Sequence, residues 1–137
     1  MKNSTFQMIN RLDAVDPMVL ALKDQVAGPL EGEALLRFDI SVTEALTNLV
    51  LHARTPLPEA EITITLHLED DEVRIDIFDP IGAAPFDLRQ SARALSDVDA
   101  MAEGGRGLGL IVECADGVDY GAIRQRNRLC LTFRGRV

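Results

Sequence analysis

Apolar and polar residues alternate in two neighbouring segments of the chain. In residues 61–68, EITITLHL, every second position is Ile or Leu, and residues 72–79, EVRIDIFD, show the same period of two. Alternate side chains of a strand point to opposite faces, so each segment predicts a strand with one buried face. Because only the polar residues EDD separate the two segments, the pattern predicts an antiparallel hairpin.

A second hairpin is predicted near the C-terminus. Its first strand covers residues 118–124, and its second strand covers residues 128–134, RLCLTFR, in which Leu, Leu and Phe alternate with other residues. The polar residues QRN, 125–127, lie between the two segments and are typical of a turn.

Helix signals precede and follow the first hairpin. The first helix is expected to have Asp16 as its N-cap and Pro17 as its first helical residue, and Gly28 and Pro29 end it. A longer helix is predicted over residues 33–53. It ends before the segment TPLPEAE, because two prolines separated by one residue do not fit a helix interior.

The rest of the chain completes the predicted fold. Residues 80–105 read as a loop that contains a short helix near residues 88–95, and another helix follows over residues 108–115, ended by Gly117. Helices and an antiparallel sheet bury their apolar faces against each other in α+β folds. We therefore expect one domain over residues 1–137, a two-layer α+β sandwich with a mixed, mostly antiparallel sheet and its helices on one face.

The long helix carries a narrow polar stripe in the segment EALTNLVLHA. Glu44, Asn48 and His52 recur at a spacing of four, which places them in one sector of a helical wheel, whereas most of the other positions are apolar. Because the helix is largely buried, a narrow row of short polar side chains on it favours a cavity that these three residues line. The alternative is that these three residues occupy the solvent-exposed edge of the helix and have no function.

A glycine-rich segment, EGGRGLGL, precedes the last predicted helix. Its glycines are Gly104, Gly105, Gly107 and Gly109. Glycines at a helix start let backbone N–H groups approach an anion, so the segment favours phosphate binding. No Gly-Lys-Ser/Thr follows, and no strand directly precedes it, which argues against a Walker A loop and a Rossmann fingerprint. A glycine turn that only caps a helix is the alternative.

A carboxylate, Asp79, ends the second strand of the first hairpin, and a Gly- and Ala-containing loop follows. A carboxylate at the end of a buried strand could accept a hydrogen bond from the amine of a ligand. The alternative is that Asp79 caps the following turn.

Together, these three features resemble the Bergerat ATP-binding fold of the GHKL superfamily (gyrase, heat-shock chaperone, histidine kinase and mismatch-repair ATPases). EALTNLVLHA is most similar to the N-box of the anti-sigma-factor serine/threonine kinases, which reads Glu-Ala-x-x-Asn-x-x-x-His-Ala, and GGRGLGLI is similar to their G2 box. The resemblance covers the chain from about Leu12 to Phe133. The G1 box departs from the usual Asp-x-Gly, because Asp79 and Gly82 are separated by two residues.

The resemblance implies a role for each matching residue. Asn48 would hold Mg²⁺ on the ATP phosphates, and Glu44 would act as general base toward a protein serine. Asp79 would accept a hydrogen bond from the adenine amino group, and residues 87–103 would form the ATP lid. His52 would support packing. The remaining ATP-binding residues would be Gly82, Gly104, Gly105, Arg106, Gly107, Leu108 and Gly109.

The function that the resemblance implies is an ATP- and Mg²⁺-dependent serine/threonine protein kinase, which acts as an anti-sigma factor in a partner-switching module and phosphorylates a STAS-domain anti-anti-sigma protein. A sigma factor as partner and a homodimer are further implications, although the first helix offers only Lys23 as a basic residue. A nucleotide-gated protein-binding regulator with little kinase activity is the alternative. A histidine kinase catalytic domain is disfavoured, since the chain has no room for a phospho-acceptor hairpin.

The composition of the chain limits the binding partners and the cellular compartment that we expect. The 137 residues include 14 Lys and Arg against 22 Asp and Glu, a formal net charge of −8. An acidic chain is a poor candidate for binding nucleic acid or an anionic membrane. Cys114 and Cys130 lie in apolar stretches and are expected to be buried, reduced thiols. Because the N-terminus lacks an apolar signal segment, we expect a cytoplasmic protein.

Overall fold

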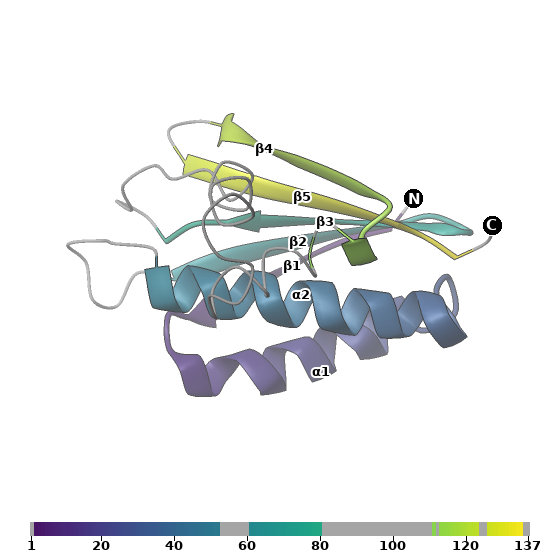
Figure 1. The fold of residues 1–137 in the computed structure, drawn as a ribbon, viewed down its shortest axis with the longest axis horizontal. Helices are drawn as coiled ribbons and strands as arrows, with labels where there is room; N and C mark the ends of the chain where they lie inside the picture. The colour runs from purple at the N-terminus through teal and green to yellow at the C-terminus, as the bar shows by residue number, and fades with distance from the viewer. Residues whose placement is uncertain (1, 53–60, 81–110, 112, 124–125, 136–137) are drawn as a thin grey trace.

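The described part of the chain folds into two layers, a five-stranded sheet and a pair of helices that cover one of its faces (Figure 1). The computed structural model describes residues 2–52, 61–80, 111, 113–123 and 126–135. The strands are β1 (Lys2–Ile9), β2 (Glu61–Leu68), β3 (Glu72–Phe78), β4 (Gly117–Ile123) and β5 (Arg126–Arg134). The helices are the 3₁₀ turn η1 (Leu12–Ala14), α1 (Val15–Val26) and α2 (Gly32–His52). The predicted α+β sandwich is confirmed.

The sheet has the order β1-β2-β3-β5-β4, and all four pairings among the described strands are antiparallel. Both predicted hairpins are confirmed. The first pairs Leu66 with Ile75, and in the second Tyr120 pairs with Leu129. The predicted turn over residues 125–127 is wrong in one respect, because β5 already begins at Arg126. Asn127 therefore lies within a strand, and this shift brings it opposite the end of β3.

The strand β1 was not predicted from the sequence. It forms the edge of the sheet and pairs with β2 along its whole length, from Lys2 opposite Leu68 to Ile9 opposite Glu61. Only Met8 in this strand is buried. A strand with so few buried apolar positions has a weak period-two signal, and its pairing partner lies about 60 residues further along the chain.

The start of α1 also differs from the prediction. The helix begins at Val15, so Asp16 is not its N-cap but lies in its first turn, after Ala14. Pro17 is tolerated there because the first N–H groups of a helix have no intrahelical acceptor. The turn η1 leads directly into α1 and replaces the predicted cap. Gly28 has a φ of 118° after the helix, a conformation that favours glycine, so the predicted end is confirmed.

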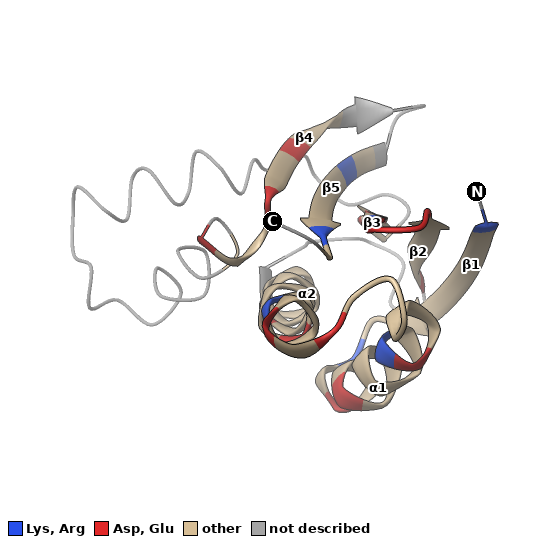
Figure 2. Cartoon of the chain, turned by 90° about the vertical axis from the view of Figure 1, so that its right-hand side faces the viewer, with Lys and Arg blue, Asp and Glu red and all other residues tan. Residues whose placement is uncertain are grey.

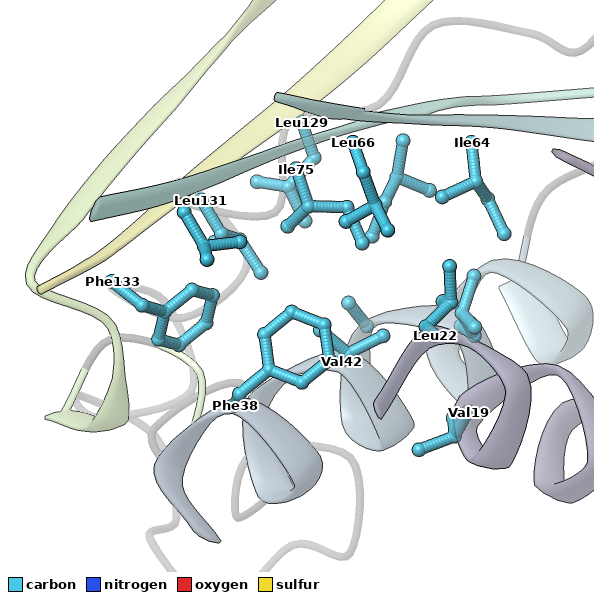
Figure 3. Packing of buried hydrophobic residues seen from close by; sticks show 14 of the residues in the cluster. Val19, Leu22, Phe38, Val42, Ile64, Leu66, Ile75, Leu129, Leu131 and Phe133 are labelled. Carbon is cyan, nitrogen blue, oxygen red and sulfur yellow. The ribbon is translucent and has the colours of Figure 1, made fainter. Parts of the chain in front are cut away.

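The core lies between the two layers (Figure 3). Phe38 of α2 and Phe133 of β5 are almost fully buried, and their rings meet edge to face with centroids 5.2 Å apart. Val19 and Leu22 of α1 are also buried. Because the apolar face of each strand and the apolar stripe of each helix meet in this layer, α2 is held tightly against the sheet.

The other face of the sheet carries a row of polar side chains. Nδ1 of His67 lies 3.0 Å from Oδ1 of Asn3, and its Nε2 lies 2.9 Å from Oδ2 of Asp76. Arg128 continues the row with contacts of 3.4 Å to Asp76 and 3.1 Å to Asp119. These five residues come from five different strands. Cross-strand pairs of this kind stabilise an open sheet face.

Several predictions fall on residues that the structure does not describe. These are the proline-containing segment over residues 53–60, the loop after Pro80 with its helix near 88–95, and the first residues of the predicted helix 108–115.

In the described residues, no helix is long and apolar enough to cross a membrane. Figure 2 shows acidic and basic residues interspersed along the two helices.

Candidate nucleotide-binding site

The polar stripe of α2 places Glu44 and Asn48 one helical turn apart, as the sequence predicts. Glu44 is half-buried, and Asn48 is only 5% exposed. The side-chain Nδ2 of Asn48 is buried and has no hydrogen-bond partner among the described residues. Buried polar atoms are nearly always hydrogen-bonded, so an amide in this state calls for a functional explanation.

Ser41 extends this stripe by one turn toward the start of α2. It is fully buried, and its Oγ donates a hydrogen bond of 3.3 Å to the carbonyl oxygen of Ile111. Ile111 lies two residues after Gly109, the last glycine of the predicted phosphate-binding segment. The helix face that carries Glu44 and Asn48 is therefore tied to the chain that follows the glycine-rich segment.

A second link joins the same face of α2 to this part of the chain. Arg37, one turn before Ser41, contacts Asp116 with Nη1 3.4 Å from Oδ1. The other carboxylate oxygen of Asp116 accepts a hydrogen bond of 2.7 Å from the backbone N–H of Arg134. Two successive turns of α2 thus hold the segment between Ile111 and the start of β4.

Asp79 directly follows β3 and is 1% exposed. Its carboxylate Oδ2 accepts a hydrogen bond of 3.1 Å from Nδ2 of Asn127, and its backbone N–H donates one of 3.0 Å to the carbonyl of the same residue. The two residues extend the register in which Phe78 opposes Arg128. Asp79 and Asn127 lie on the face of the sheet that the helices cover. Asp79 is two positions after Ile77, and Ile77 belongs to the core on that face.

The stripe and the carboxylate lie on the same side of the molecule. In Figure 1, the C-terminal end of α2 and the end of β3 both lie on the left. Asn48 is in the next-to-last turn of α2, and Asp79 follows β3 immediately. An amide oxygen can bind a hard cation, and a buried carboxylate can accept a hydrogen bond from an amine. The arrangement suits a ligand that carries both anionic and amino groups.

Ser41 and Asn127 are two residues of this region that the sequence patterns do not single out. Ser41 could have been found as a short polar residue on the same helical stripe, seven positions before Asn48. Asn127 precedes a clearly alternating segment and was assigned to the turn, so the sequence contained no signal that it faces Asp79.

Most of the predicted phosphate-binding residues cannot be placed. Gly82, Gly104, Gly105, Arg106, Gly107, Leu108 and Gly109 lie outside the described residues, as does the predicted lid over residues 87–103. His52 is the last residue of α2, and its side chain is outside the description. The described part of the chain contains no cluster of three or more His, Cys, Asp or Glu side chains that could hold a metal ion.

The two cysteines are free, and neither is activated as a nucleophile. Burial, followed by a hydrogen bond and the charge from Asp76, raises the pKa of Cys130 to about 12. Burial, followed by the charge of Glu113, also raises the pKa of Cys114. The prediction of two buried thiols in apolar surroundings is correct only for the burial of Cys130, since Cys114 is half-buried and Cys130 lies beside a carboxylate. Thiolate chemistry is therefore disfavoured at neutral pH.

The chain is similar in sequence to known proteins. The model of a family described as "Histidine kinase-like ATPase domain" matches residues 9–133. A curated relative, the serine-protein kinase RsbW of Listeria innocua serovar 6a, is 33% identical over 92 residues. That alignment covers 63% of this chain and 57% of the relative, so the chain spans little more than half the length of the protein that it matches.

Proposed function

Because this chain belongs to the histidine kinase-like ATPase family, we propose that it is an ATP- and Mg²⁺-dependent serine/threonine protein kinase. It would act as an anti-sigma factor in a cytoplasmic partner-switching module, with a STAS-domain anti-anti-sigma protein as its substrate. The observation that carries the proposal is the pair formed by Glu44 and Asn48 on one face of α2, in which the Asn48 amide has an unpartnered Nδ2 among the described residues.

The chemistry of phosphoryl transfer supports these assignments. Catalysis of this reaction depends mostly on positioning and on neutralisation of the phosphate charge, which Mg²⁺ supplies when bound. Mg²⁺ prefers oxygen ligands and keeps several waters, so the amide oxygen of Asn48 and few other protein ligands would suit it. Glu44, one turn away and half-buried, would take the proton from the attacking serine hydroxyl. Asp79 would bind the adenine amino group.

The similarity to a serine-protein kinase supports the choice of serine as acceptor. The sigma factor and the homodimer rest on the family resemblance alone. Lys23 is the only basic residue of α1, and its Nζ lies 2.8 Å from Oδ2 of Asp39 on α2. Binding of a sigma factor through Lys23 would have to break this ion pair.

Replacement of Glu44 by Gln tests the proposal. The variant should bind ATP as the wild type does but transfer phosphate to a STAS-domain protein more slowly by roughly 10²- to 10⁴-fold, the usual contribution of a general base. Glu31→Gln removes an exposed carboxylate outside the site and is the matched control. The product should be an acid-stable phosphoserine, identified by mass spectrometry.

Two outcomes would contradict the proposal in different ways. Normal transfer by Glu44→Gln would remove Glu44 from the role of base. ATP binding by the wild type, without phosphoserine on any STAS-domain protein, would instead support the nucleotide-gated regulator. An acid-labile phosphate would indicate phosphohistidine and would exclude a serine kinase.

A further inference from the structure

We infer that Asn127 sets the base selectivity of the nucleotide site by fixing the orientation of the Asp79 carboxylate. The inference rests on the proposed function, in which Asp79 accepts a hydrogen bond from the amino group of adenine. Asn127 is thus a positioning residue, and it acts through Asp79.

The contacts between the two residues are closely defined. They are directly opposite in the antiparallel pairing of β3 and β5, one step beyond Phe78 and Arg128. Asp79 is joined to Asn127 both through its backbone N–H, at 3.0 Å, and through its carboxylate Oδ2, at 3.1 Å. Both residues are less than one tenth exposed. Because the backbone contact fixes the spacing of the strands, the side-chain contact fixes the rotation of the carboxylate.

A fixed carboxylate discriminates between purines by simple chemistry. An ionised carboxylate only accepts hydrogen bonds. Adenine presents an amino donor at C6, whereas hypoxanthine presents an oxo acceptor at the same atom, and two acceptors held face to face repel each other. Without the amide of Asn127, the carboxylate could rotate away from an oxo group, or take up a proton and donate a hydrogen bond to it. Either change would reduce the preference for adenine.

The dissociation constants of ATP and inosine triphosphate, measured calorimetrically with Mg²⁺ on the full chain, test this inference. The wild type should bind ATP more tightly. Asn127→Ala should lower the ratio of the inosine triphosphate constant to the ATP constant by roughly 10- to 100-fold, the effect of one hydrogen bond to a charged group. Asn127→Thr keeps a hydrogen-bond donor, the hydroxyl group, in a residue that strands favour. This variant should therefore retain most of the preference for ATP over inosine triphosphate. In an Asp79→Ala background, Asn127→Ala should leave the ratio unchanged.

Other results would overturn the inference. An equal loss of ATP and inosine triphosphate binding in Asn127→Ala would mean that the residue has only a structural role. A change in the ratio that persists without the Asp79 carboxylate would mean that Asn127 acts on the base directly. If Asn127→Ala does not fold, Asn127→Leu, which is similar in size and lacks a donor, provides the same comparison, alone and with Asp79→Ala. A wild type that binds neither nucleotide would contradict the proposed function itself, whereas a wild type that binds both equally would contradict the role of Asp79.

Discussion

Replacement of Asn48 by Leu should stabilise the free protein and abolish its response to ATP and Mg²⁺. Asn48 is 5% exposed, and its neighbours Ala45 and Leu49 on α2 belong to the core. Its Nδ2 has no hydrogen-bond partner in the part of the chain that the structure describes. A buried amide without a partner lowers the stability of the fold. Such a residue is expected where a ligand, and not the protein, completes its hydrogen bonds.

The size of the stabilisation follows from the burial of this amide. A buried donor without a partner costs about 1–3 kcal/mol, which Leu would recover. Leu is also the better helix former, by a few tenths of a kcal/mol. Its different branching should cost up to about 1.5 kcal/mol in repacking. At the middle of these ranges, the free energy of unfolding should therefore rise by about 1.5 kcal/mol, and the midpoint of thermal unfolding by roughly 5 °C.

Thermal unfolding with and without ATP and Mg²⁺ measures both effects at once. At about 100 times its dissociation constant, a ligand that binds only the folded state adds about 2.7 kcal/mol. The wild type should show this shift, whereas Asn48→Leu should start from a higher midpoint and show none. Asn48→Ala should also lose the shift. The half-buried neighbour Thr47 offers the control, since Thr47→Ala should keep the full response to nucleotide.

Two results would refute this reasoning. If Asn48→Leu lowers the stability of the free protein by more than about 1 kcal/mol, the amide is satisfied within the fold and is not reserved for a ligand. If the variant keeps the full shift with ATP and Mg²⁺, Asn48 does not hold the metal.

Three further predictions follow from the core, a buried thiol and an ion pair. Phe38→Ala should remove the ring contact with Phe133 and cost about 3–5 kcal/mol, a drop of roughly 10–20 °C in the unfolding midpoint; a drop below about 3 °C would contradict tight packing at this position. Because burial and the neighbouring Asp76 raise the pKa of Cys130 from 9.0 to about 12, the native thiol keeps its proton between these pH values while the unfolded thiol loses it. Alkylation of Cys130 by iodoacetamide at pH 9 should therefore be much faster in the unfolded protein than in the native protein, and equal rates in the two states would contradict the raised pKa. The stability that the buried, protonated thiol contributes should be lost as the pH rises from 9 toward 12. A double-mutant cycle with Lys23→Met and Asp39→Asn should give a coupling of about 0.5–1 kcal/mol, as expected for a partly exposed pair, and no coupling would mean that α1 and α2 are joined by apolar contacts alone.

The sequence by itself determined the features that depend on local periodicity. The alternation in residues 61–68 and 72–79 predicted β2 and β3, because strands with one buried face must alternate. The spacing of Glu44 and Asn48 placed them on one face of α2, since a helix repeats every 3.6 residues. These patterns are set by neighbours within about one turn or one hairpin, so they can be read without the fold.

Only the tertiary structure decided the contacts between distant segments. The edge strand β1 pairs with a segment some 60 residues away, and its own sequence has too few buried apolar positions to predict it. Asn127 was assigned to a turn, but it meets Asp79 because β5 pairs with β3 rather than with β4 alone. Ser41 reaches Ile111 across 70 residues. Side chains so far apart in sequence meet only after the layers have packed, which is why no local pattern predicts them.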